Sequence, residues 1–310
     1  MGKIAFVFPG QGSQYVGMGK SLHDKYASAS DVYLACGRSA DTANIFNNAK
    51  HCSFFGPQER LTVTDTAQPA IFMADLAAAS ALRERGVAAD GAAGFSLGEI
   101  PALAYTGLLS TEEAFKFSCF RAAAMHKCTI NHKGGMMAVL GLEKEAIEDI
   151  CSRVEGAYPA NYNAPGQVVV SFKEEAQSAL KTAVIAVKGK TIPLSVAGAF
   201  HSPLMDDAAV KAADFLAKIN FNDMEIPLYA NVTGQLYTTP RELLAGQINS
   251  PVLWQAAIEQ MITDGYDTFI EAGPGKTLTG LIKKISSSNK NIRTFNVFDE
   301  ESLEEAVKNV

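Results

Sequence analysis

The stretch Gly94-Phe95-Ser96-Leu97-Gly98 decides the fold class and contains the first candidate reactive group. It matches the pattern GxSxG. The small residues at 91–94 are typical of a short buried strand, and residues 99–103 are helix-prone. A nucleophile elbow needs small residues because a strand turns sharply into a helix there, leaving little room beside the serine. A chance glycine-rich turn explains the pattern alone equally well, but the strand–turn–helix context favours the elbow.

Strands and helices alternate on both sides of this segment. We expect strands at 4–8, 227–232, 268–272 and 294–298, with helices between them. From about residue 131 the rhythm shortens to a compact β-α-β-α-β run, which is similar to a split βαβ, ferredoxin-like insert. The sequence therefore predicts an α/β protein with a discontinuous large domain, 1–130 and 200–310, and a small subdomain at 131–199.

Composition excludes several classes of protein. The 310 residues are 47% hydrophobic and 19% charged, which is enough to fill a core and argues against disorder. No apolar run approaches the ~18 residues of a membrane span, and the first residues resemble a strand rather than a signal peptide. The net charge of −6 gives no basic footprint for nucleic acid. Five scattered cysteines indicate reduced thiols in a cytoplasmic protein, and the histidines show no metal-ligand spacing.

A serine nucleophile needs a base, and His201 is the best candidate of the five histidines. It follows an expected strand and precedes a new helix, which is where active-site residues gather in α/β proteins. A packed core histidine is the alternative. The only aspartate between Ser96 and His201 is Asp149, on an amphipathic helix beside Glu148, where we expect a solvated side chain. This favours a serine–histidine dyad whose imidazole is oriented by a backbone carbonyl.

Arg121 is the lone charge on the apolar face of a helix expected over 111–128. A buried guanidinium needs an anion, and its fork fits a carboxylate. A structural ion pair with a glutamate and capture of an anionic substrate are equally compatible with the pattern. The loop at 10–14 lacks the GxGxxG spacing of a dinucleotide site, but Gln11 there could offer a backbone N–H to an oxyanion.

Together these residues resemble the malonyl-CoA:acyl carrier protein transacylases of fatty acid synthesis. The resemblance extends over nearly the whole chain. It comprises the segments 6–14, 68–70, 94–99, Arg121, 160–169, 200–205, 250–254 and 271–276. It implies an α/β-hydrolase-like core with an inserted ferredoxin-like subdomain. It also implies that Ser96 is the nucleophile, that His201 is its base, that Arg121 binds the malonyl carboxylate, and that the N–H groups of Gln11 and Leu97 form the oxyanion hole.

The resemblance implies further roles around this centre. The backbone carbonyl of Leu253 would orient His201, and Asn163 and Gln68 would line the cleft. Phe200 would crowd an α-methyl group and so favour malonyl over methylmalonyl, by ~1–3 kcal/mol. Phe95 departs from the family's usual GHSxG, and we expect its side chain to point away from the reacting bond.

The implied substrates are malonyl-CoA and an acyl carrier protein, whose phosphopantetheine belongs to the partner, so no resident cofactor or metal is expected. We expect a monomer without nucleic-acid or membrane partners. A trans-acting acyltransferase of a polyketide synthase would have the same residues. A proofreading thioester hydrolase would not need Arg121, and an inactive carrier-protein scaffold would not need the reactive residues.

Overall fold

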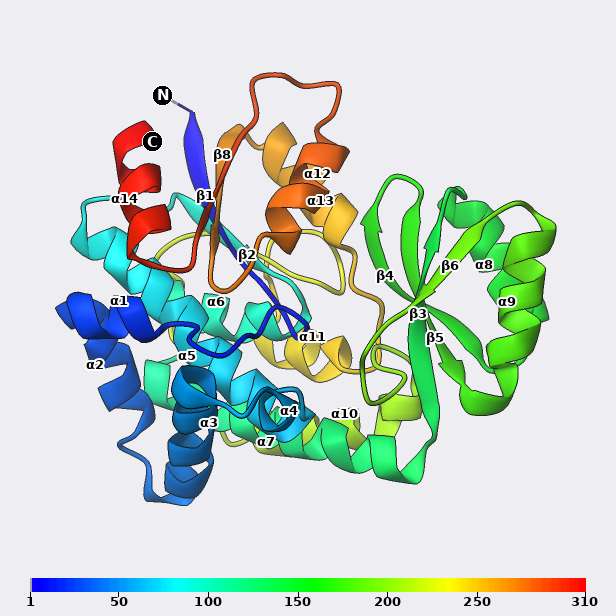
Figure 1. Ribbon diagram of the computed structural model, residues 1–310, viewed down its shortest axis with the longest axis horizontal. Coiled ribbons are helices and arrows are strands. Elements are labelled where there is room, and N and C mark those ends of the chain that lie inside the picture. Colours follow the sequence, from blue (N-terminus) through cyan, green and yellow to red (C-terminus); the bar gives the residue numbers. More distant parts are fainter. Residues whose placement is uncertain (1) are drawn as a thin grey trace.

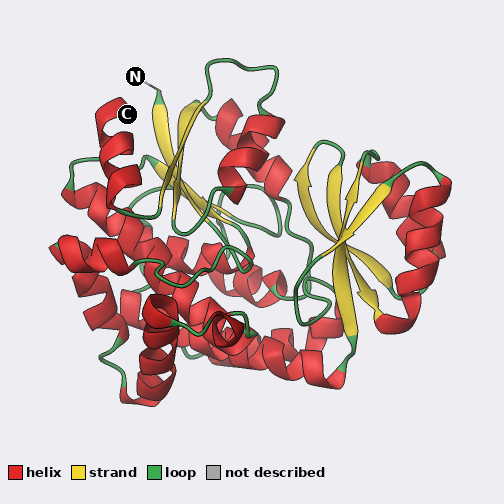
Figure 2. Cartoon of the chain, viewed as in Figure 1, coloured by secondary structure: helices red, strands yellow, loops and turns green. Residues whose placement is uncertain are grey.

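The larger part of the computed structural model, which describes residues 2–310, is built on a five-stranded parallel sheet (Figures 1 and 2). The strand order is β7-β2-β1-β8-β9. The strands are β1 (Lys3–Phe8), β2 (Gly91–Gly94), β7 (Leu228–Tyr229), β8 (Tyr266–Ala272) and β9 (Arg293–Val297). Parallel strands need crossover connections, so this sheet confirms the α/β class that the alternating rhythm predicts.

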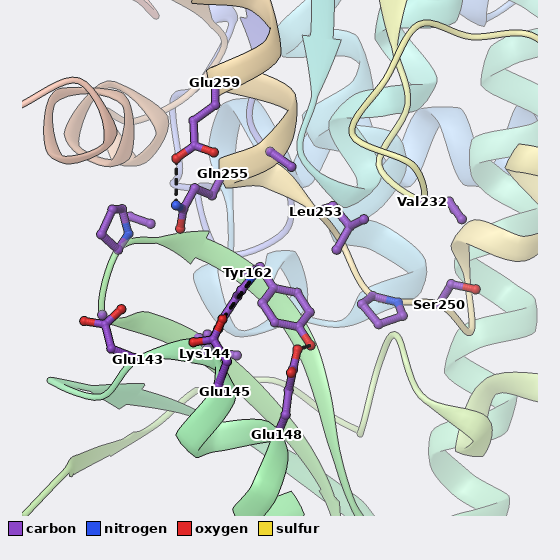
Figure 3. Close-up of a pocket in the computed structure, with 16 residues that line it drawn as sticks. Glu143, Lys144, Glu145, Glu148, Tyr162, Val232, Ser250, Leu253, Gln255 and Glu259 are labelled. Atoms are coloured by element: carbon purple, nitrogen blue, oxygen red, sulfur yellow. Dashed lines mark hydrogen bonds and ion pairs between the residues drawn. The ribbon is translucent and has the colours of Figure 1, made fainter. Parts of the chain in front are cut away.

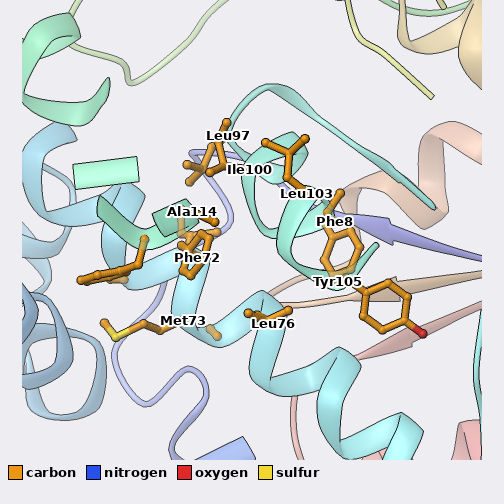
Figure 4. Close-up of a cluster of buried hydrophobic side chains, with 14 of the residues drawn as sticks. Phe8, Phe72, Met73, Leu76, Leu97, Ile100, Leu103, Tyr105 and Ala114 are labelled. Carbon is orange, nitrogen blue, oxygen red and sulfur yellow. The ribbon is translucent and has the colours of Figure 1, made fainter. Parts of the chain in front are cut away.

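Alternation along β1 buries both faces of the sheet. Phe6 and Phe8 point to the face covered by α5 (Thr64–Glu84), α6 (Glu99–Tyr105) and α7 (Thr111–Asn131), and Figure 4 shows the resulting cluster. Ala5 and Val7 point to the opposite face, covered by α12 (Trp254–Thr263) and α13 (Thr277–Ile285). A period of two with every position apolar is what a strand between two helical layers requires. The carboxyl end of the sheet, where Ser96 follows β2, is therefore held by packing on both faces.

The remaining helices extend this packing at the surface of the large domain. α7 begins as predicted, because the Ser110 hydroxyl accepts a hydrogen bond from the backbone N–H of Glu113 at 3.2 Å. The other helices of this domain are α1 (Lys20–Lys25), α2 (Ala27–Cys36), α3 (Ala43–Phe55), α4 (Gln58–Leu61), α10 (Asp206–Leu216), α11 (Pro240–Gln247) and α14 (Glu300–Asn309). No helix within residues 2–310 is long and apolar enough to cross a membrane.

A second, antiparallel sheet of order β4-β5-β3-β6 lies beside the large domain (Figure 1). Its elements are β3 (Gly134–Leu140), α8 (Lys144–Arg153), β4 (Ala157–Ala164), β5 (Gln167–Lys173), α9 (Gln177–Ala186) and β6 (Lys190–Pro193). The order βαββαβ contains one strand more than the sequence rhythm predicts. β4 escapes prediction because Pro159, Asn161 and Asn163 belong to residue types that are depleted in strands.

The two faces of the small sheet have different neighbours. Met137 and Val139 pack against α8 and α9, whereas Met136 and Ala138 face the large domain. The edge strand β4 is tied to the large domain, because Tyr162 N–H donates to the Val252 carbonyl at 2.9 Å. A cavity between the sheets therefore has walls from both domains.

Candidate active site

Ser96 lies on a strained turn directly after β2. Its φ of +53° lies in the left-handed region, which residues other than glycine rarely adopt. A Cβ on Gly94 would lie 2.0 Å from the carbonyl carbon of Gly98, and a Cβ on Gly98 would lie 2.0 Å from the Phe8 carbonyl oxygen. Both glycines of the GxSxG pattern are thus required by close backbone approach, as expected for a nucleophile elbow.

Asn231, which follows β7, braces this turn. Its Oδ1 accepts a hydrogen bond from the Ser96 N–H at 2.7 Å, and its Nδ2 donates to the Gly94 carbonyl at 2.5 Å. The two bonds link the strand end and the serine to the neighbouring strand. The backbone conformation of Ser96 is therefore held by a side chain that the sequence analysis did not single out.

His201 meets Ser96 from the segment that returns to the large domain after β6. Its Nε2 lies 2.7 Å from Ser96 Oγ, and its Nδ1 donates to the backbone carbonyls of Gln247 at 2.9 Å and Ser250 at 3.2 Å. Burial, with a smaller contribution from the positive charge of Arg121, lowers the pKa of His201 to about 4. The imidazole is neutral at pH 7, and the two carbonyls hold its proton on Nδ1, so Nε2 is free to take the serine proton.

The predicted role of Leu253 is wrong. Leu253 precedes α12, and its carbonyl accepts the N–H of Ala257 at 3.0 Å in the first turn of that helix. Leu253 lines a cleft between α12 and the small sheet, which Ser250 also lines (Figure 3). The backbone-carbonyl idea holds, but the carbonyls belong to Gln247 and Ser250, because the chain turns toward the imidazole before α12 begins.

Asp149 is exposed on α8 and pairs with Arg153 one turn later, as expected for a solvated residue. It plays no part in the arrangement around His201.

Arg121 on α7 brings a third group to the same place. The side chain is only 1% exposed. Its Nη1 donates to Gln68 Oε1 at 2.8 Å, and its Nη2 donates to Gln247 Oε1 at 2.8 Å and to Ser96 Oγ at 3.2 Å. Both amides are neutral partners, unlike the glutamate of a structural ion pair. Burial lowers the pKa of Arg121 to about 10, so the guanidinium stays charged at neutral pH.

The Nε–H of Arg121 is buried without a hydrogen-bond partner among residues 2–310. A buried donor on a charged group is costly to leave unpaired. The guanidinium is therefore oriented by the two amides, keeps its charge, and retains one N–H donor that is unpaired among the described residues.

A cavity of about 250 Å³ connects these groups. It brings together Ser96, His201 and Arg121, and with them the predicted residues Gln11, Gln68, Leu97, Asn163 and Phe200. The Oδ1 of Asn163 is buried and unpartnered among the described residues. Apolar side chains complete the wall, among them Met125, Met136, Leu194, Val196 and Leu281.

Phe95 lines this cavity as well, so the expectation that its side chain points away from the reacting centre is only half right. Its ring packs edge-on against Trp254, with ring centroids 5.5 Å apart. At the position where the resemblance leads one to expect histidine, this chain thus has an apolar wall.

Gln247 and Glu99 were missed by the sequence analysis, although one signal for Gln247 exists. Leu243, Leu244 and Gln247 are spaced three and four residues apart, so they share one face of α11, and all three are buried. A lone amide on an apolar helix face is the same kind of signal that identified Arg121. Asn231 offers no comparable signal, because it lies in a loop after a two-residue strand.

The fold and this site define a class: an α/β protein with a serine on an elbow, a neutral imidazole beside it, and a buried cation facing the same cavity. Residues 5–300 match the family model described as acyl transferase domain. The malonyl CoA-acyl carrier protein transacylase of Bacillus subtilis (strain 168) is 36% identical over 316 residues, covering 99% of this chain and 97% of that protein.

Solved structures agree with these sequence comparisons. The malonyl CoA-acyl carrier protein transacylase from Clostridium perfringens has a TM-score of 0.92 and 36% identity, covering 99% of this chain and 96% of that one. A malonyl-transacylase solved in complex with its type II polyketide synthase acyl-carrier protein has a TM-score of 0.91 and 31% identity, covering 99% and 100%. The chain belongs to the acyl transferase domain family and, within it, to the malonyl CoA-acyl carrier protein transacylases.

Proposed function

We propose that this enzyme transfers the malonyl group of malonyl-CoA to the phosphopantetheine thiol of an acyl carrier protein through an ester on Ser96. One observation supports this most directly. The hydroxyl of Ser96 lies 2.7 Å from a neutral imidazole and 3.2 Å from a charged guanidinium whose other direct hydrogen-bond partners are two neutral amides. A nucleophile and a carboxylate receptor thus share one cavity.

In the first half of the cycle, Ser96 Oγ attacks the thioester carbonyl while His201 Nε2 takes its proton. The tetrahedral intermediate collapses, the carbon–sulfur bond breaks, and His201 returns the proton to the coenzyme A sulfur. Arg121 binds the free carboxylate of the malonyl group and so fixes the reacting carbonyl over Ser96.

The negative charge that develops on the thioester oxygen needs N–H donors. Leu97 directly follows the nucleophile at the start of the turn into α6, where backbone N–H groups point outward. Gln11 faces the same cavity from the loop after β1, and no hydrogen-bond acceptor for its backbone N–H is described within residues 2–310. These two groups form the proposed oxyanion hole.

In the second half, the carrier protein's thiol gives its proton to His201 and attacks the malonyl ester, and Ser96 leaves with that proton. Carrier proteins of this kind are acidic, and this chain is net acidic too. Docking therefore needs a local basic surface on this chain. Lys283 and Lys284 lie on α13, whose Thr277 and Leu281 line the cavity. This position supports them as docking residues.

The proposal places the enzyme in fatty acid synthesis, as a cytoplasmic monomer without a resident cofactor. The similarity to a malonyl-transacylase solved with a type II polyketide synthase carrier protein favours one second candidate, the supply of malonyl groups to a polyketide synthase. The preferred carrier protein distinguishes the two candidates.

Intact-protein mass spectrometry after exposure to malonyl-, acetyl- and methylmalonyl-CoA tests the proposal. We expect malonyl mass on the wild type and none on Ser96→Ala. Ser118→Ala is a matched control, because Ser118 is another buried serine, on α7; it should load normally. Absence of malonyl on the wild type would refute the proposal, and release of free malonate much faster than transfer would favour a hydrolase.

A further inference from the structure

A chain of hydrogen bonds runs from the serine elbow to the guanidinium through Glu99, the first residue of α6. Glu99 Oε1 accepts the backbone N–H of Asn231 at 3.0 Å, and Glu99 Oε2 accepts from Gln247 Nε2 at 2.5 Å. Gln247 Oε1 in turn accepts from Arg121 Nη2 at 2.8 Å. Glu99 is 1% exposed and is not among the residues that line the substrate cavity.

The direction of every bond in this chain is set by its two ends. The backbone N–H of Asn231 can only donate, and so can the guanidinium of Arg121. A side-chain amide such as that of Gln247 donates at one end and accepts at the other. A chain with donors at both ends and one amide in it therefore needs one member that accepts at both ends. The carboxylate of Glu99 does so through its two oxygens, whereas the protonated acid does so only when its O–H points to a third group, such as the neighbouring Tyr237 hydroxyl.

A further contact makes the orientation of Gln247 one-sided. Its Nε2 also donates to the Ser96 carbonyl at 2.6 Å. If the amide turned over, its oxygen would face both that carbonyl and the Glu99 carboxylate, and its NH₂ group would face the guanidinium. Such like-to-like contacts between buried groups lose the hydrogen bonds and leave polar atoms unpaired.

Burial opposes the ionised form of Glu99, and its polar neighbours favour it. Burial raises the pKa of Glu99 to about 7, against the polar contacts from Asn231, Gln247 and the Tyr237 hydroxyl and the positive charge of Arg121, which act to lower it. The carboxylate therefore predominates only above neutral pH.

We propose that Glu99 is a positioning residue that acts through Gln247: its carboxylate fixes the side-chain amide so that the carbonyl oxygen, not the NH₂ group, meets Arg121 and holds the guanidinium for the substrate carboxylate. The selectivity part of this inference rests on the proposed malonyl transfer; the positional part does not.

Glu99→Gln is the most informative substitution, because it keeps the shape of the side chain but replaces one acceptor oxygen by an NH₂ donor. The new amide must turn its oxygen to the fixed N–H of Asn231, so its NH₂ group faces the NH₂ group of Gln247. Gln247 must then shift away or turn over, against its hydrogen bond to the Ser96 carbonyl. Asp75→Asn is the matched control. Asp75 is another fully buried carboxylic acid, on α5, with neither oxygen hydrogen-bonded in the described part of the chain.

Two measurements decide the inference. The first is kcat/KM for Ser96 loading with malonyl-CoA and with acetyl-CoA, which has no free carboxylate. For Glu99→Gln we expect the malonyl-to-acetyl ratio to fall at least about tenfold, the size of one hydrogen bond to a charged group, mainly through the malonyl KM. Asp75→Asn should leave the ratio unchanged. The second is a crystal structure of Glu99→Gln without ligand, in which the contact between Gln247 Oε1 and Arg121 Nη2 should be lost.

The outcomes separate the inference from the proposed function. An equal loss with both substrates, accompanied by a lower Tm, would reduce Glu99 to a structural residue and overturn the inference. So would an unchanged ratio, or an unchanged Gln247–Arg121 contact in the crystal. If the wild type takes up no malonyl group, the proposed function fails, and the crystal structure alone then decides whether Glu99 positions Arg121.

Discussion

Replacing Arg121 by methionine should separate carboxylate recognition from acyl transfer. Methionine keeps much of the volume of the arginine stem but has no donor for the malonyl carboxylate. A hydrogen bond between charged partners contributes about 1.5–3 kcal/mol, so losing two of them costs about 3–6 kcal/mol. At 1.36 kcal/mol per factor of ten, kcat/KM for malonyl-CoA should fall by about 10²–10⁴.

Acetyl-CoA provides the internal reference for this substitution. Its acyl group has no carboxylate, so only the 3.2 Å contact between Arg121 and Ser96 Oγ is lost, and loading should fall by less than about tenfold. The rate of acyl loading on Ser96 can be measured with each substrate by quenching the reaction at set times and weighing the intact protein by mass spectrometry. The measurement is made at a temperature where the variant is folded. Folding needs this check because the substitution leaves the Gln68 and Gln247 oxygens without their donor.

Arg121→Lys is the control for charge alone. It keeps a cation but lacks the planar fork, so malonyl loading should fall between the wild-type and methionine values. Equal losses with malonyl- and acetyl-CoA in the methionine variant would refute the reasoning, because they would show that the guanidinium serves the chemistry or the fold and not the carboxylate.

Three further predictions concern other parts of the site. Because burial lowers the pKa of His201 from an ordinary 6.5 to about 4, the folded protein resists a protonation that the unfolded chain accepts. The free energy of unfolding, measured with urea, should therefore decline as pH falls from 6.5 toward 4, by up to ~3 kcal/mol from this group. Loading with acetyl-CoA, which needs no carboxylate capture by Arg121, should stay at pH 5.5 close to its value at pH 7. Phe200→Ala should reduce the preference for malonyl- over methylmalonyl-CoA by about 10- to 100-fold, as expected when a pocket gains room for one methyl group; an unchanged preference in competition assays would show that the ring does not contact that methyl group. Asp149→Asn should leave turnover with malonyl-CoA unchanged, and a marked loss would reinstate an acid in the triad.

The sequence could predict those parts of the site in which a single strand, turn or helix by itself demands a particular residue type. The glycines flanking Ser96 are needed because backbone atoms lie where side chains would be, and a lone guanidinium on an apolar helix face needs a partner. Both patterns are visible within one element. The uninterrupted apolar run of residues 4–8 in β1 likewise indicates a strand buried on both faces.

The parts that escaped prediction depend on contacts between distant elements. Gln247 and Asn231 act through residues far away in the chain, and nothing in their own neighbourhoods specifies that distance. The Leu253 error has the same origin, since the carbonyl that faces His201 depends on where the chain turns before α12. β4 was missed for a local reason: proline and asparagines weaken its strand signal, although pairing with β5 and the tie to Val252 stabilise it.

The division of the cavity between two domains has a consequence for how such enzymes diversify. Ser96, Arg121 and His201 all belong to the large domain, whereas Asn163 and Val169 reach the cavity from the small antiparallel sheet. The reacting groups and one wall of the cavity thus come from separate segments of the chain. Exchanging residues 134–193 between relatives should therefore change the small-sheet wall of the cavity while Ser96, His201 and Arg121 stay in the retained segments.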